Sequence, residues 1–303
     1  MPSSSVVIVN WNAADVLPAC IESIRSQDLA EPPQIVLLDN ASTDGSVEVL
    51  RELLNEDELI ESPENLGFGR GNNVAAKRAR GEFLLFLNPD TELVGSDCLS
   101  TLLASASEEE IGLVGPMLLN VDGSIQKSVG AFPSIRYGSI QGTGVDRLFS
   151  DEVCAHLSPL RWSQSWSRDV DWLKGAALVM RRSLFEDLGG FSESTFMYSE
   201  DSDLAFRCRG RGLRVRYETR AEVVHVDDHS SKKRWTESEK EELVARADMA
   251  FLREHYSLPH RLCIRAVLFA GFASRALVLR VLRRQGRSEV YYRMAKVVGS
   301  RPF

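Results

Sequence analysis

The sequence is poor in cysteine, and its cysteines do not form any arrangement typical of a disulfide framework or a zinc site. Five cysteines are scattered along 303 residues, and no Cys-x-x-Cys occurs. An odd, dispersed set of this kind is typical of buried thiols in a reducing compartment. The amino terminus has no basic segment before its first apolar run, so we expect no secretory signal. These features predict a cytoplasmic protein.

Two phosphate-binding signatures are also missing. No Walker A sequence occurs anywhere in the chain. A run of glycines at positions 67, 69 and 71 does not follow the first predicted strand with the spacing of a dinucleotide-binding fingerprint. The glycine run is therefore only weak evidence for phosphate binding.

An uninterrupted membrane-spanning segment is absent as well. Residues 262–282 are long enough to cross a bilayer, but Arg265, Arg275 and Arg280 fall inside them. Each arginine costs about 2.5–3.5 kcal/mol near the bilayer centre. Residues 261–303 hold ten Arg or Lys and one Glu, whereas the whole chain has a net charge of −7. A basic C-terminal segment on an otherwise acidic chain indicates that this segment binds an anionic partner, either a membrane or a nucleic acid.

We favour the membrane and expect no nucleic-acid partner. The arginines at 261, 265, 275, 280, 283 and 287 project onto about half of a helical wheel and leave a largely apolar opposite side. Such a helix is suited to lying in the interface of anionic lipids. We therefore expect the protein at the inner face of the cell membrane. The alternative is a helix that packs on the rest of the chain or on the second copy of a homodimer.

The first 110 residues alternate strand and helix patterns. With 44% hydrophobic and 26% charged residues, the composition is that of a soluble globular protein. Strands are predicted at 6–9, 35–38, 59–60 and 83–87, with helices between them. A βαβαβαβ order predicts an α/β fold, with a mostly parallel central sheet covered by helices on both faces.

Polar side chains follow these strands where each strand ends. They are Asn10 and Asn12, Asp39 and Asn40, and Asn88 and Asp90. The carboxyl ends of parallel strands meet at the edge where α/β sheets bind ligands. Asp39 could accept a hydrogen bond from a pyrimidine ring or a ribose, or it could cap the following turn. The Asn-Pro-Asp at 88–90 suits a hard cation such as Mg²⁺ or Mn²⁺, although the same residues are common in turns.

The second half of the sequence supplies further strands and an acidic cluster. Strands are predicted at 111–114, 117–119 and 125–129, and another at 173–180 is interrupted by Gly175. Residues 131–170 have little periodicity and are predicted to be an acceptor loop or lid. Tryptophans 162, 166 and 172 could stack on a sugar or lie in the core. A capping box is predicted at Ser183–Glu186. A helix is predicted to begin with the acidic residues Glu200, Asp201 and Asp203. Acidic side chains at a helix N-terminus are also stabilised by the helix dipole.

Several motifs occur in the order in which they occur in one enzyme family. They are Val-Asn-Trp-Asn at 9–12, Asp-Asn-Ala-Ser-Thr-Asp-Gly-Ser at 39–46, Glu-Asn-Leu-Gly-Phe-Gly-Arg-Gly-Asn-Asn at 64–73 and Leu-Asn-Pro-Asp-Thr at 87–91. With these motifs, residues 5–235 resemble the family 2 glycosyltransferases of GT-A fold, and in particular the rhamnosyltransferase-like branch.

The resemblance implies a role for each site residue. The donor-binding residues would be Asn10, Asn12, Asp39, Asn40, Gly71, Asn72, Asn88 and Asp90, with Asp39 on the nucleotide base. Asp90 would bind Mg²⁺ or Mn²⁺ together with His225, and Asn88 replaces the first acid of the family's Asp-x-Asp motif. Asp201 would be the catalytic base, with Glu200 beside it. Acceptor contacts are expected from Trp172, Gly175 and Glu200. Asp203 would serve as a helix cap or as an orienting group.

The sequence thus predicts a GT-A domain over residues 1–235 and a helical extension over 236–303. Residues 1–110 would bind the nucleotide sugar, and residues 111–235 would supply the acceptor side. By this resemblance, the expected reaction is inverting, cation-dependent transfer of a sugar, with dTDP-rhamnose as the expected donor and a UDP-sugar as the other donor class. The acceptor would be a glycan or a polyprenyl-linked sugar. The alternatives are a catalytically silent carbohydrate- or nucleotide-binding protein and a nucleotidyltransferase. A Ser231 in place of the Gln of the Gln-x-x-Arg-Trp motif favours single transfer over processive synthesis.

Overall fold

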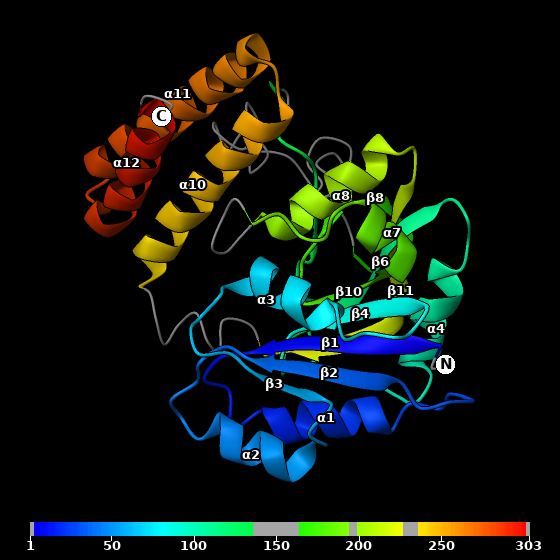
Figure 1. Ribbon diagram of the computed structural model, residues 1–303. Coiled ribbons are helices and arrows are strands. Elements are labelled where there is room, and N and C mark those ends of the chain that lie inside the picture. The colour runs from blue at the N-terminus through cyan, green and yellow to red at the C-terminus, as the bar shows by residue number, and fades with distance from the viewer. Residues whose placement is uncertain (1–2, 136–163, 194–198, 227–235, 301–303) are drawn as a thin grey trace. The chain divides into compact units, whose positions relative to one another are not determined.

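The computed structural model of the chain describes residues 3–135, 164–193, 199–226 and 236–300 (Figure 1). The chain divides into two compact units. The first comprises residues 1–130 and 164–230, and the second comprises residues 131–163 and 231–303. Residues 194–198 and 231–235, and most of the predicted acceptor loop with Trp162, lie outside the described residues.

A mixed sheet forms the centre of the first unit. Its strands are β1 (Ser4–Asn10), β2 (Gln34–Asp39), β3 (Leu59–Glu61), β4 (Phe83–Leu87), β5 (Thr91–Leu93), β6 (Ile111–Leu119), β8 (Arg168–Val170), β10 (Ala177–Arg181) and β11 (Arg214–His225). They run in the order β3-β2-β1-β4-β10-β6-β11-β5, and β8 pairs with β11. A separate two-stranded sheet joins β7 (Val129–Gly130) to β9 (Trp172–Leu173).

The predicted alternation of strands and helices is confirmed in the first half. Strands β3, β2, β1 and β4 are parallel neighbours, and β10 then pairs antiparallel with β4. The helices of the first unit are α1 (Leu17–Arg25), α2 (Ser46–Leu53), α3 (Phe68–Ala76), α4 (Cys98–Ala106), α7 (Arg182–Asp187) and α8 (Glu200–Gly210). Helices α1 and α2 lie on one face of β1–β3, and α3 lies on the other (Figure 1). All five residues of β4 are buried, as expected of a central strand covered on both faces.

Three local predictions were wrong. The strand predicted at 125–129 is only an isolated bridge at Ile125, followed by β7 at Val129–Gly130. Residues 111–119 form one strand, β6, instead of two, because Pro116 sits beside a register shift in the pairing with β11. A bulge of this kind tolerates the missing N–H of proline. The capping box at Ser183 does not form either. Helix α7 begins at Arg182, directly after β10, so its N-cap is Arg181, two residues before Ser183, and it has no side-chain cap.

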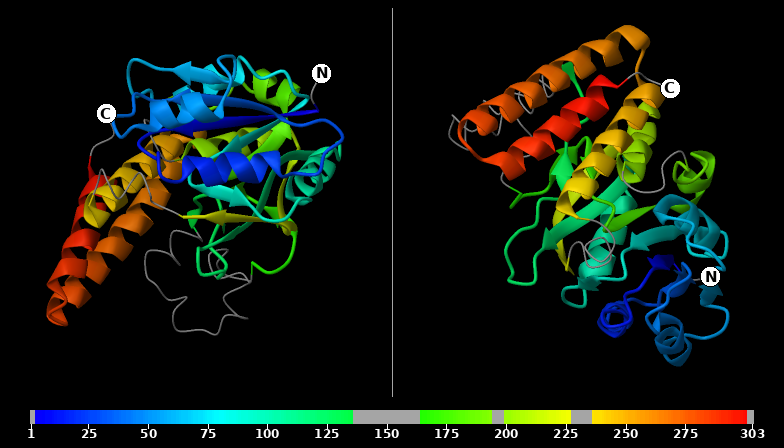
Figure 2. Two further views of the ribbon diagram at one scale, coloured as in Figure 1. Left: turned by 90° about the horizontal axis from the view of Figure 1, so that it is seen from below. Right: turned by 90° about the vertical axis from the view of Figure 1, so that its left-hand side faces the viewer.

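Three helices make up most of the described part of the second unit, and they lie side by side (Figures 1 and 2). They are α10 (Glu237–His255), α11 (Leu258–Val281) and α12 (Gln285–Gly299). Thr236 and Glu239 form a capping box at the start of α10. A small core joins the helices through Leu252, Ile264, Leu268, Phe272, Ala295 and Val298. The predicted C-terminal helical extension is therefore present.

Candidate active site

Side chains from β1 and β2 meet at the carboxyl edge of the sheet. Asn10 and Asp39 are the last residues of neighbouring parallel strands and lie opposite each other in register. Asn10 Nδ2 donates a 2.8 Å hydrogen bond to Asp39 Oδ1, and the backbone N–H of Ser42 donates a 3.0 Å bond to Asp39 Oδ2. These bonds fix the orientation of a buried carboxylate. Asn10 Oδ1 is also buried and has no hydrogen-bond partner among the described residues.

Asn12 and Asn40 use their amides to connect the loops of this edge. Asn12, at a φ of 52°, accepts a 2.7 Å hydrogen bond from the backbone N–H of Thr43. Asn40 Oδ1 accepts a 2.7 Å bond from the Leu66 N–H, and its Nδ2 donates to the Gly67 carbonyl at 3.2 Å. Together they hold the loops after β1, β2 and β3 in one arrangement.

Gly71 and Asn72 lie in α3, on the side that packs against β1. A Cβ on Gly71 would stand 3.0 Å from Val9 Cγ1, so the glycine allows a close approach of helix and strand. The buried Asn72 amide donates to the Phe68 carbonyl at 3.0 Å, within the helix. Its neighbour Asn73, which the sequence did not single out, exchanges two hydrogen bonds with the backbone of Phe191 at 2.9 and 2.8 Å. Asn73 therefore anchors the segment that precedes α8 in the chain.

The antiparallel pairing of β5 with β11 brings His225 to Asp90. His225 is opposite Thr91 in register, and the Val226 N–H donates to the Asp90 carbonyl at 3.0 Å. His225 Nε2 lies 3.4 Å from Asp90 Oδ1 and 3.4 Å from Asn88 Nδ2. Both Asp90 and His225 are buried.

This pair fits a divalent cation. Two ligands at neighbouring positions of an octahedral ion, each about 2.1 Å from it, lie about 3 Å apart. A carboxylate oxygen suits Mg²⁺ and Mn²⁺ alike, and an imidazole nitrogen is a common metal ligand. Asp90 and His225 would hold the ion.

Helix α8 presents Asp201 at its first turn. Asp201 Oδ2 accepts a 2.9 Å hydrogen bond from the Gly175 N–H, and Oδ1 accepts a 2.7 Å bond from the Ser202 N–H. The neighbouring Ala176 carbonyl accepts from the Asn88 N–H at 2.9 Å, so Asp201 is bound one residue away from a residue that contacts the turn of Asn88 and Asp90. Burial raises the pKa of the Asp201 carboxyl, and the backbone hydrogen bonds from Ser202 and Gly175 offset part of that effect.

Glu200 lies beside Asp201 in a more buried position. A Cβ on Gly69 of α3 would stand 3.4 Å from Glu200 Cγ, and Glu200 Oε1 has no hydrogen-bond partner among the described residues. Burial, reinforced by the charge of Asp201, raises the pKa of Glu200 to about 8. Glu200 is therefore largely a neutral acid at neutral pH, whereas its neighbour holds the two backbone donors.

Glu200→Gln should flatten the dependence of stability on pH. The folded-state pKa of Glu200 lies above its ordinary value of 4.5, so protonation stabilises the folded protein at acid pH. That contribution is lost as pH rises from about 4.5 to about 8, by up to about 1.4 kcal/mol per pH unit. Urea unfolding of both proteins at pH 5.5, 7 and 8.5 measures this. As pH rises, the free energy of unfolding of the variant should increase relative to that of the wild type. The same pH dependence in both proteins would contradict the prediction.

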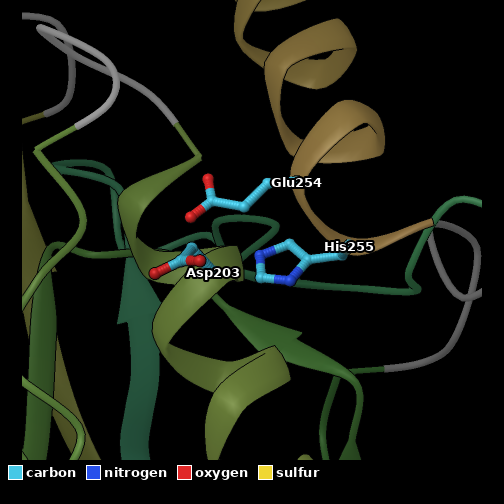
Figure 3. Close-up of side chains that lie close together, drawn as sticks. All are labelled: Asp203, Glu254 and His255. Atoms are coloured by element: carbon cyan, nitrogen blue, oxygen red, sulfur yellow. The ribbon is translucent and has the colours of Figure 1, made fainter.

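The remaining predicted residues have structural contacts. Trp172 lies over Gly130, where a Cβ would meet its indole ring at 2.2 Å. Asp203 accepts a 2.8 Å hydrogen bond from Arg207 Nε, one helical turn further on. Asp203 belongs to α8 of the first unit, and Glu254 and His255 belong to α10 of the second (Figure 3). We assign no metal site to these three residues.

The first unit has the fold of the GT-A glycosyltransferases, a class in which a mostly parallel sheet presents its carboxyl edge to a nucleotide sugar. One solved structure with this fold is a mannosyltransferase from Pyrobaculum calidifontis in complex with GDP-Man and Mn²⁺. It has a TM-score of 0.62 and 17% identity, and the match covers 99% of this chain and 88% of that one. Another is GalNAc-T7 with UDP, GalNAc and Mn²⁺, at a TM-score of 0.58 and 15% identity over 96% of this chain and 55% of that one.

The family model of glycosyl transferase family 2 matches residues 5–142, so this part of the chain is a family 2 glycosyltransferase domain. Its relatives include the N-acetylglucosaminyl-diphospho-decaprenol L-rhamnosyltransferase of Mycobacterium tuberculosis, which is 29% identical over 75% of this chain and 76% of its own length. The rhamnosyltransferase WbbL of Escherichia coli is 24% identical over 75% of this chain and 84% of its own length. The O-antigen biosynthesis protein RfbC of Myxococcus xanthus is 29% identical over 76% of this chain, but the match spans only 18% of that protein.

Proposed function

We propose that the chain transfers a sugar, with inversion and with a divalent cation, from a nucleotide-sugar donor to a hydroxyl of a glycan or polyprenyl-linked acceptor. The observation that carries the proposal is the position of Asp201. It accepts a hydrogen bond from the N–H of Gly175, which is next to Ala176, and the Ala176 carbonyl binds the turn that bears Asp90, whose carboxylate lies 3.4 Å from His225. Two relatives are named as rhamnosyltransferases, which supports rhamnose from dTDP-rhamnose as the transferred sugar. The name of another relative, the O-antigen biosynthesis protein RfbC, favours a place in polysaccharide biosynthesis.

Asp201 is proposed to act as the general base. One carboxylate oxygen takes the proton of the acceptor hydroxyl, while the acceptor oxygen forms a bond to the anomeric carbon. The bond from that carbon to the donor diphosphate breaks, and the diphosphate leaves with its electron pair. Attack from the face opposite the leaving group inverts the anomeric configuration. A cation held by Asp90 and His225 would neutralise charge on the leaving diphosphate.

The other site residues are proposed to hold the substrates. Asp39, oriented by Asn10 and Ser42, would accept a hydrogen bond from the nucleotide base. Asn12, Asn40, Gly71, Asn72 and Asn88 would shape the donor site through the loops and the helix that they position. Glu200, Trp172 and Gly175 would lie on the acceptor side.

Turnover of a panel of nucleotide sugars tests this function. Each donor is added with and without Mn²⁺, thermal shift reports binding, and released nucleoside diphosphate reports transfer to a polyprenyl-diphosphate sugar. We expect dTDP-rhamnose to give the largest turnover, with dependence on the cation. NMR of the product anomeric signal tests inversion. Binding of donors without transfer to any acceptor would argue for the silent binding protein instead.

Helix α11 is proposed to hold the enzyme on an anionic membrane surface. By length and composition alone, α11 could cross a membrane. However, Arg265 donates to the Val298 carbonyl at 2.8 Å, and Arg275 Nη1 lies 3.4 Å from the Tyr291 hydroxyl, so both arginines bind α12. Among the exposed residues of α11 are the apolar side chains of Leu262, Phe269, Leu277 and Val281. Arginines 280, 283, 284 and 287 are exposed at its end and at the start of α12.

Liposome flotation tests the membrane proposal. The protein should float with anionic vesicles, stay behind with neutral ones, and be partly released by high salt, because a peripheral contact of this kind is electrostatic as well as apolar. A Leu277→Asp/Val281→Asp variant should lose most of this binding.

The control for flotation is Val121→Asp, which changes a valine with 73% exposure in the first unit. This variant should float like the wild type. If the wild type floats with neither kind of vesicle, the proposal is wrong, and the exposed face of α11 binds protein instead, such as a second copy of the chain. Association that resists salt and requires detergent would instead indicate a helix that spans the membrane.

A further inference from the structure

A buried glutamine that no sequence motif identified makes four side-chain contacts around the proposed metal ligand His225. Gln126 is 6% exposed and lies in the segment between β6 and β7. Its Oε1 is 2.7 Å from His225 Nδ1 and 3.1 Å from Lys174 Nζ. Its Nε2 donates to the His225 carbonyl at 3.2 Å and to Asn120 Oδ1 at 3.0 Å.

These contacts allow only one orientation of the Gln126 amide. A lysine ammonium carries donors and no acceptor, so the amide atom that faces Lys174 must be oxygen. The two oxygens on the other side, from His225 and Asn120, require the amide nitrogen. The same amide oxygen faces His225 Nδ1, and that ring nitrogen must therefore carry a proton to donate.

We propose that Gln126, held by Lys174, is a positioning residue that fixes the tautomer and the ring orientation of His225. With the proton on Nδ1, neutral His225 has its lone pair on Nε2, the atom that lies 3.4 Å from Asp90 Oδ1. Such a lone pair is what a cation requires of an imidazole ligand, and partners at the other ring nitrogen tune affinity for the metal by about 10–100-fold. The inference rests on the proposed metal site of Asp90 and His225.

The local fold explains why residue 126 reaches this place. The turn Asn120–Gly123 closes with a 2.9 Å hydrogen bond from the Gly123 N–H to the Asn120 carbonyl, with Gly123 at a φ of 79°. The chain then returns along β6, where the Gln126 N–H donates to the Leu118 carbonyl at 2.8 Å. Strand β6 is the parallel neighbour of β11, which carries His225 at its end.

Two readouts test the role of Gln126, and neither is activity. The first is the Kd of Mn²⁺, titrated alone and measured by electron paramagnetic resonance. Gln126→Leu should weaken binding by about 10–100-fold. Gln126→Glu, which keeps an acceptor for both His225 Nδ1 and Lys174, should restore most of it. The second is ¹⁵N NMR of histidine in the metal-free protein, with the His225 signals assigned by their loss in His225→Gln. Wild-type His225 should be protonated on Nδ1, and Gln126→Leu should change that tautomer.

The control is Gln27→Leu, because Gln27 is another buried glutamine of the first unit with three hydrogen bonds of its own, to Ser23, Gly95 and Leu99. The Gln27→Leu variant should be less stable than the wild type but should have the same Mn²⁺ affinity and the same His225 spectrum. If Gln126→Leu binds Mn²⁺ like the wild type while His225→Ala does not, the inference is wrong and the proposed metal site stands. If the wild type and His225→Ala bind Mn²⁺ equally, both are wrong.

Discussion

Replacing Asp201 by asparagine should lower kcat by about 100-fold or more and leave donor affinity nearly unchanged. The amide has the size of the carboxylate but cannot take the acceptor proton. The proposed metal ligands Asp90 and His225 belong to a different turn and strand, so we expect the leaving-group side of the reaction not to depend on Asp201. Steady-state kinetics with a saturating acceptor, together with calorimetric titration of the donor, measures the two quantities separately.

The structure adds a cost that must be controlled in this experiment. The two oxygens of Asp201 each accept a backbone hydrogen bond, from Gly175 and from Ser202. An asparagine can accept only one of them, so we expect a stability loss of about 1–3 kcal/mol. Thermal unfolding therefore accompanies the kinetics. Asp169→Asn, which removes a surface partner of Arg214 and Arg216, is the matched control and should keep full activity. A kcat near the wild-type value in Asp201→Asn would exclude this residue as the base.

The sequence was sufficient to predict the parts of the fold that depend on local pattern. A run of five apolar residues predicted β4, and the polar residues that follow β1, β2 and β4 do meet at one edge of the sheet. Asn10 and Asp39 are bonded because parallel strands in register end together. The helical extension predicted over residues 236–303 is likewise present, as helices α10, α11 and α12.

The contacts that complete the site could not be read from local pattern. His225 meets Gln126 across 99 positions of the chain, and Asn73 meets Phe191 across 118. Neither pair can be recognised from periodicity or spacing in the sequence, since each contact depends on the order of the strands in the sheet. Residues 111–119 show the same limit. Gly115 and Pro116 suggested a break between two strands, yet pairing with β10 and β11 keeps β6 continuous.

Asp90→Ala and His225→Ala should each abolish the cation-dependent part of donor binding. Both side chains are buried, and Asp90 Oδ1 and His225 Nε2 lie 3.4 Å apart, so the loss of either would leave one of the two proposed protein ligands. A nucleotide diphosphate would then bind without charge compensation. Calorimetric titration of dTDP-rhamnose or UDP-glucose, with Mn²⁺ and with a chelator, gives the cation-dependent difference in Kd. This difference should fall by about 10-fold or more in both variants.

The two variants should differ in what remains. Asp90→Ala removes a negative charge from beside the diphosphate, so donor affinity in the chelator should stay equal or improve, because like charges disfavour each other in a buried site. His225→Ala removes a neutral ligand and leaves the Asp90 carboxylate and Gln126 without one of their partners, so it should also lose stability.

A double variant tests whether Asp90 and His225 act on one ion. If both ligands bind the same cation, Asp90→Ala/His225→Ala should lose little more cation-dependent affinity than either single change. Additive losses, or unchanged affinity in both single variants, would place the cation elsewhere in the chain.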